Sequence, residues 1–173
     1  MQLLEDDILR LRALEPEDLE VLYRWENDAT LWAVGNTLAP YSRYLLKQYI
    51  AQAHEDIYTL RQLRLLIERK ADARSVGLVD LYDFDPHHLR AAVGIIVDPS
   101  CQRQGIAWRA LALLHAYAFS FLRLHQLYAY IPVSNVASEQ LFRQAGYEET
   151  GLLKDWLIDM AGFCDVRVMQ KIN

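Results

Sequence analysis

The sequence predicts a mixed α/β fold, and three observations support this prediction. Segments that alternate apolar and polar residues, typical of strands, are interspersed with segments whose apolar residues recur at helical spacing. Three expected strands follow one another between residues 62 and 97, which indicates an antiparallel meander. The meander leads through a long apolar helix into another strand, which indicates a βαβ unit with parallel strands.

The first third of the chain predicts one strand and two helices. Residues 8–13 alternate apolar and basic residues, as a strand does. A helix begins at residues 15–18, because proline suits the first helical turn and acidic side chains stabilise the positive end of the helix dipole. Residues 27–40 contain glycine, asparagine and proline and predict a loop. Ser42 then caps a second helix.

The remainder predicts the meander, the crossover helix and the closing strands. The meander strands lie at residues 62–68, 76–84 and 91–97, and polar turns separate them. The last of these strands runs into a polar loop and the long apolar helix. The elements expected after that helix are a strand at 126–131, a helix that begins at Asn135 and ends before Gly146, and two strands near 147–157 and 165–172.

Length and composition restrict the class of protein. The 173 residues fit a single domain over 1–173, and a net charge of −5 argues against nucleic acid as a partner. Two cysteines are too few for a disulfide framework or a zinc signature, so no metal is expected. The chain has neither a signal-peptide pattern at its start nor an uncharged apolar run of spanning length. We therefore expect a cytoplasmic protein with no membrane partner.

Residues 95–107 carry the most chemical information. A buried strand runs through a short polar loop into the N-terminus of a helix, where main-chain N–H groups have no intrahelical partner. These N–H groups and the helix dipole favour an anion. Gly105 and Ala107 are small enough for a bulky ligand to approach the backbone. The segment predicts a phosphate or diphosphate site, although an ordinary strand–turn–helix connection has the same spacing.

Two motifs resemble the GNAT superfamily of acyl-CoA-dependent N-acyltransferases. Residues 102–107, Gln-Arg-Gln-Gly-Ile-Ala, are similar to its Gln/Arg-x-x-Gly-x-Gly/Ala motif, and residues 135–147 are similar to its late Asn–helix–aromatic–Gly-Tyr segment. The resemblance covers nearly the whole chain. Within the superfamily, residues 77–81 and 90–107 look most like the spermidine N-acetyltransferases, followed by the ribosomal-protein N-terminal acetyltransferases.

The resemblance implies a twisted mixed sheet of six to seven strands, split between strands four and five and flanked by about four helices. Acetyl-CoA would be the co-substrate and would lie in the split, with its pantetheine arm along strand four and its diphosphate on the following loop. The residues implied in coenzyme binding are Ile95, Ile96, Val97, Gln102, Arg103, Gln104, Gly105, Ile106, Ala107, Asn135 and Phe142.

The usual catalytic groups are absent from this sequence. The resemblance implies a tyrosine acid where the chain has Phe142 and a glutamate base where it has Ala92. Asp80 and Asp83, on the strand beside strand four, are candidate replacements, and a solvated strand face explains them equally well. Tyr147 is a further candidate proton donor, together with Tyr82, Tyr128 and Tyr130.

The acceptor is expected to contact the first two helices and their loop. Aromatic and acidic side chains there suit a cationic amine, although core packing and surface charge also explain them. The sequence favours transfer of an acetyl group to a small, polyamine-like amine. A peptide N-terminus as acceptor, and a weakened acyl-CoA-binding module, are the alternatives. The apolar C-terminal segment could form a homodimer interface or could simply complete the sheet. The candidate acceptor residues are Trp25, Glu26, Asp28, Trp32 and Tyr41.

Overall fold

The computed structural model describes residues 3–31, 39–159 and 161–173. Seven strands form one sheet in the order β1-β2-β3-β4-β5-β7-β6. The strands are β1 (Leu9–Arg12), β2 (Leu63–Arg69), β3 (Arg74–Asp85), β4 (Arg90–Val97), β5 (Gln126–Pro132), β6 (Glu148–Asp159) and β7 (Gly162–Ile172). The helices are α1 (Leu19–Glu26), α3 (Arg43–Gln52), α4 (Ile57–Leu60), α5 (Ile106–Ala116) and α6 (Val136–Gln144). Two short 3₁₀-helices are η1 (Pro16–Asp18) and η2 (Pro99–Cys101), and η3 (Tyr117–Phe121) is a π-helical segment that continues α5.

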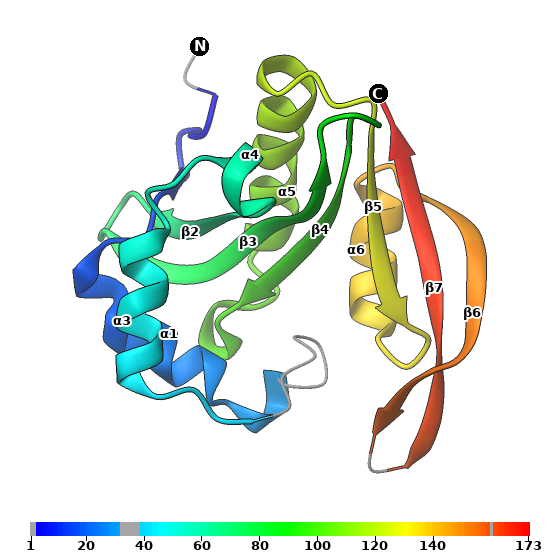
Figure 1. The fold of residues 1–173 in the computed structure, drawn as a ribbon, viewed down its shortest axis with the longest axis horizontal. Helices are drawn as coiled ribbons and strands as arrows, with labels where there is room; N and C mark the ends of the chain where they lie inside the picture. The colour runs from blue at the N-terminus through cyan, green and yellow to red at the C-terminus, as the bar shows by residue number, and fades with distance from the viewer. Residues whose placement is uncertain (1–2, 32–38, 160) are drawn as a thin grey trace.

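The sheet is mixed and splits between β4 and β5, which confirms the expected fold class. β1 to β4 pair antiparallel, β4 and β5 pair parallel, and the remaining pairs are antiparallel. The parallel pairing joins only residues 90–92 of β4 to residues 126–128 of β5. Beyond that point the two strands diverge, and the gap between them widens toward the loop that follows β4 (Figure 1).

Apolar side chains of alternate strand positions pack on opposite faces of the sheet. One core joins α1 and α3 to β2 and β3 and includes Leu22, Leu46, Leu66 and Leu78. The larger core lies on the other face, where α5 and α6 pack, and includes Leu111. The two cores hold α1 and α5 on opposite faces of the sheet (Figure 1).

Several local expectations are confirmed, and others need revision. Ser42 caps α3, since its hydroxyl accepts a hydrogen bond from the Leu45 N–H at 3.1 Å. The single-turn helix α4, which Asp56 caps, was not predicted, and four residues give too short a pattern to recognise. Residues 32–38 of the predicted 27–40 loop, which include Trp32, lie outside the described residues. No helix in the described ranges is long and apolar enough to span a membrane.

Candidate active site

The split between β4 and β5 holds a cavity of about 620 Å³. From Val93 to Val97 β4 still pairs with β3 but has no partner on the β5 side, so one edge of its backbone faces the opening. Ile95 and Ile96 line the cavity as expected. Val97 is not among the described lining residues, although it ends the same open edge. The open edge can therefore accept main-chain hydrogen bonds from an extended ligand, as a sheet edge does.

The loop after β4 offers a row of unengaged N–H groups. Among the described residues, the main-chain N–H groups from Gln102 to Ala107 donate no hydrogen bond within the chain. Gly105 has φ +76°, and a Cβ atom placed there would meet nothing within 4 Å. These N–H groups precede the N-terminus of the 11-residue helix α5, so helix dipole and free donors act together. Donors and open space fit the diphosphate of coenzyme A.

Basic side chains add positive charge around this loop. Arg103 has φ +60°, is exposed, and forms no ion pair within the described part of the chain. Arg74 donates to the Ser100 hydroxyl at 2.8 Å, and Arg24 reaches Asp98 from α1 at 3.1 Å. The side-chain amides of the loop's glutamines bond only to nearby carbonyl oxygens. The loop is therefore suited to an anionic ligand by its backbone and by its side chains.

Trp25 lies in α1 as expected but is not among the described residues that line the cavity. Its side chain is only 2% exposed, and its indole N–H donates to a carboxylate oxygen of Asp98 at 2.9 Å. Asp98 also accepts from the Ser100 N–H and hydroxyl. Burial opposes ionisation of Asp98, but these donors outweigh it and lower its pKa to about 2. Trp25 thus fixes α1 to the start of the loop after β4.

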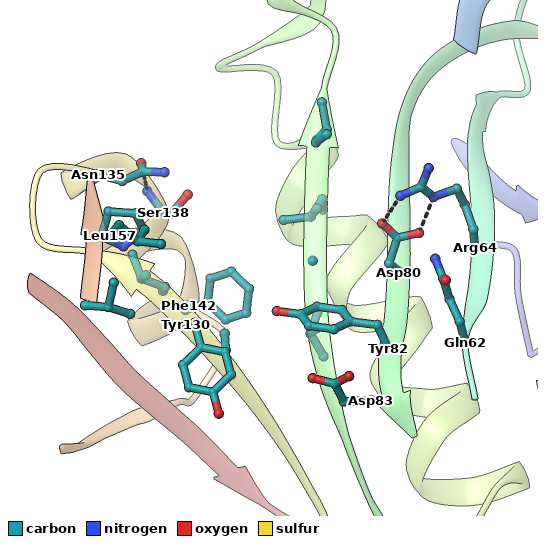
Figure 2. Close-up of a pocket in the computed structure, with 18 of the residues that line it drawn as sticks. Gln62, Arg64, Asp80, Tyr82, Asp83, Tyr130, Asn135, Ser138, Phe142 and Leu157 are labelled. Atoms are coloured by element: carbon teal, nitrogen blue, oxygen red, sulfur yellow. Dashed lines mark hydrogen bonds and ion pairs between the residues drawn. The ribbon is translucent and has the colours of Figure 1, made fainter. Parts of the chain in front are cut away.

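Glu26 and Asp80 line the cavity, but Arg64 occupies their carboxylates. The guanidinium of Arg64 donates to both oxygens of Asp80 at 2.7 and 3.0 Å (Figure 2). It also donates to Glu26 at 2.6 Å. Burial opposes the charge on Arg64, yet the carboxylates keep its pKa above the ordinary value. Asp80 therefore helps to hold a buried ion-pair cluster, and its oxygens are not free to accept an amine proton.

Asp83 differs from Asp80 because its carboxylate has no hydrogen-bond or ion-pair partner among the described residues. It lies at an irregularity of β3, where the register with β4 shifts between Tyr82 and Asp85, and it has φ +48°. Side chains of consecutive residues in a regular strand point to opposite faces. The irregularity brings Tyr82 and Asp83 to the same cavity, as Figure 2 shows.

Phe142 and Asn135 reach the opening from the β5 side. Phe142 is 3% exposed and lines the cavity at the position where the resemblance implies a catalytic tyrosine. Asn135 caps α6 through its Oδ1, which accepts from the Ser138 N–H at 3.1 Å. Its amide nitrogen has no partner in the described ranges and points into the opening (Figure 2). Asn135 can therefore cap the helix and contact a ligand at the same time.

Tyr147 lies behind Phe142 and does not line the described cavity. Its ring packs edge-on against Phe142, with centroids 4.8 Å apart, and its hydroxyl bonds to His115 Nε2 at 3.0 Å. Burial raises the pKa of Tyr147 and lowers that of His115 to about 4. Ala92 is fully buried where β4 meets β5. Neither position brings a proton-transfer group to the opening.

Asp28 and Tyr41 also lie outside the described cavity lining. Asp28 accepts from the N–H and hydroxyl of Thr30, and these bonds lower its pKa. The Tyr41 N–H donates to the side chain of Asn27 at 2.8 Å. The structure gives both residues a local role in the connection after α1. Arg64, which lines the cavity, was not predicted as a site residue. Its place in the alternating pattern of β2 indicates only an exposed basic side chain.

Comparisons with known proteins agree with this geometry. Residues 9–148 match the Acetyltransferase (GNAT) domain. The spermidine N(1)-acetyltransferase of Escherichia coli K12 is 30% identical over 145 residues, which cover 84% of this chain and 75% of that protein. The spermidine N-acetyltransferase of Vibrio cholerae in complex with CoA and spermine is similar with a TM-score of 0.87, 27% identity and 96% coverage of each chain.

A dodecameric structure of the Vibrio cholerae enzyme is also similar, with a TM-score of 0.80, 27% identity and coverage of 96% of this chain and 95% of that one. The family match extends over most of the sequence and includes β4 and β5, which border the split, the loop after β4 and α6. The chain therefore belongs to the GNAT acetyltransferases, enzymes that depend on acetyl-CoA as the acetyl donor.

Proposed function

We propose that this enzyme transfers the acetyl group of acetyl-CoA to a primary amine of a polyamine-like acceptor. The observation that carries the proposal is the opening between β4 and β5, because its cavity lies along the open edge of β4 and the free N–H groups of residues 102–107 follow that edge in the chain. A diphosphate bound at the loop directs the rest of the coenzyme along the open edge of β4. The open edge would hold the arm by main-chain hydrogen bonds, and Asn135 would contact it from the other side.

Charge in the cavity favours a cationic acceptor. Its described lining carries three carboxylates against two guanidinium groups, one net negative charge. Arg64 neutralises much of the charge of Glu26 and Asp80, so Asp83 is the carboxylate most available to an ammonium group. The aromatic ring of Tyr130, 43% exposed, adds a surface for a cation–π contact.

The reaction requires a neutral amine at the thioester carbon. Asp83 attracts the ammonium form into the cavity and accepts its proton, directly or through one water molecule. The freed amine then attacks the carbonyl, whose oxygen would be stabilised by main-chain N–H groups on the open edge of β4. The enzymes named above, described as spermidine N-acetyltransferases, support this acceptor class, and the dodecameric relative supports a homo-oligomer of this chain.

Release of free thiol from acetyl-CoA tests the proposal with spermidine, spermine, an amino sugar and a peptide with a free N-terminus. We expect the highest kcat/KM with a polyamine. Asp83→Asn should lower kcat/KM for the polyamine about tenfold or more and leave the Kd of CoA unchanged, whereas Asp72→Asn, on the exposed turn between β2 and β3, should do neither.

Two results would contradict the polyamine proposal in different ways. Turnover with the peptide alone would assign a protein N-terminus as the acceptor. CoA binding without transfer to any amine would assign a binding module, the reading that Phe142 at the expected acid position favours.

A further inference from the structure

The departing thiolate of coenzyme A needs a proton, and the residues behind Phe142 do not supply one. Phe142 presents a hydrocarbon ring to the cavity, and Tyr147 is buried with its hydroxyl bonded to His115. A hydroxyl group on another wall of the cavity is the remaining kind of donor.

Tyr82 supplies such a hydroxyl from the β3 side. Its register partner is Ala92, which is also the last β4 residue paired with β5, so Tyr82 lies at the level where the opening closes. Its ring leans over the neighbouring Gly94, where a Cβ would lie 3.6 Å from Tyr82 Cε1. The glycine leaves room for the ring to cross β4, and the hydroxyl points toward Phe142 (Figure 2).

The surroundings of Tyr82 suit a proton donor. Its hydroxyl has no hydrogen-bond partner among the described residues, in contrast to that of Tyr147. Burial and the neighbouring Asp83 carboxylate raise the pKa of Tyr82 to about 12, so the phenol stays protonated at neutral pH. A coenzyme anchored at residues 102–107 and laid along the open edge of β4, as proposed above, would end where β4 and β5 begin to pair. Its acyl end would then lie at the level of Tyr82.

We infer that Tyr82 is the catalytic acid of this enzyme and protonates the sulfur of coenzyme A. The inference rests on the proposed transfer reaction. The amine nitrogen forms a bond to the carbonyl carbon, the C–S bond breaks with its electron pair left on sulfur, and the phenolic hydrogen moves to sulfur. Asp83 takes the ammonium proton before the attack, and the second proton, which the nitrogen loses as the amide forms, returns through water to the phenolate. The products are the N-substituted acetamide and the free thiol.

Tyr82→Phe removes only the hydroxyl and tests this role. We expect kcat for the best amine to fall about 10²- to 10⁴-fold. The Kd of CoA, measured by calorimetry, should stay within about twofold, because the hydroxyl acts on the departing sulfur. Adding Phe142→Tyr to Tyr82→Phe should recover at least about tenfold in kcat, since it restores a phenol to the same cavity.

Tyr117→Phe is the matched control, because Tyr117 stacks on Phe121 outside this cavity. Removal of its hydroxyl should leave kcat unchanged. An unchanged kcat in Tyr82→Phe would overturn the role of Tyr82 while leaving the transfer reaction intact. A parallel loss of CoA affinity would show that Tyr82 shapes the site and would overturn the role as well. If the wild-type enzyme acetylates no amine, the proposed function fails first and this role fails with it.

Discussion

Asp98 joins α1 to the start of the loop after β4, and its substitution gives a quantitative test. Its side chain is 9% exposed and accepts from Arg24, Trp25 and Ser100. Folding lowers the pKa of this carboxyl from 3.8 to about 2. A difference of this size corresponds to about 2 kcal/mol of folding free energy at neutral pH.

Asp98→Asn keeps the shape of the side chain and removes the negative charge of the carboxylate. It should therefore lower the free energy of unfolding by about 2 kcal/mol at pH 7. The direction of the pKa change sets how this stabilisation depends on pH. A carboxyl whose pKa is lower in the folded state stabilises the fold at pH values above its pKa in the unfolded state, 3.8. This stabilisation is lost as pH falls toward the folded-state pKa of about 2. The difference between wild type and variant should therefore shrink to roughly half at pH 3.

Urea unfolding followed by tryptophan fluorescence measures the difference in unfolding free energy between wild type and variant at pH 7 and at pH 3. Asp72→Asn is the matched control, since pairing with Arg69 also lowers the pKa of Asp72 to about 2, but on an exposed turn. Solvent screening should make its effect much smaller. Equal losses for the two variants, or a loss at Asp98 that stays constant from pH 7 to pH 3, would refute the argument from a buried ionised carboxylate.

Three further substitutions test separate parts of the account. Gly105→Ala, at φ +76°, should cost about 1–2 kcal/mol in unfolding free energy and weaken CoA binding in calorimetry; unchanged stability and affinity would contradict the left-handed turn. Tyr147→Phe should cost about 1 kcal/mol through the lost His115 bond and leave kcat within about twofold, so a large fall in kcat would return Tyr147 to the candidate acids. Arg64→Gln should lower stability by about 3 kcal/mol in thermal or urea unfolding because two carboxylates lose their buried partner; a neutral effect would show that solvent already satisfies them.

The sequence predicted the elements that have strong periodic patterns or specific end signals. The β4–loop–α5 segment combines an apolar strand, a glycine and a long apolar helix, and the structure has each of them at the expected place. The split of the sheet depends on how far β4 pairs with β5, which no local pattern encodes. The split was predicted from the resemblance to the GNAT superfamily, and the short pairing of β4 with β5 shows it.

The side-chain environment of the site was harder to predict. Trp25 and Asp80 have the residue types of an amine site, but their partners, Asp98 and Arg64, lie 73 and 16 residues away in the sequence. Only the folded chain shows that these groups are already bonded. Tyr82 and Asp83 are consecutive, so strand alternation would separate them, and only the irregularity of β3 brings both to the cavity.

The central claim is that the free main-chain N–H groups of residues 102–107 bind the diphosphate of coenzyme A. A titration of the ¹⁵N-labelled protein with CoA, followed by amide NMR shifts, tests it most directly. We predict that the amide signals of Arg103 to Ala107 move strongly and saturably with CoA and stay nearly still with pantetheine, which lacks the diphosphate. Saturable binding of CoA that leaves these amide signals unmoved would contradict the claim.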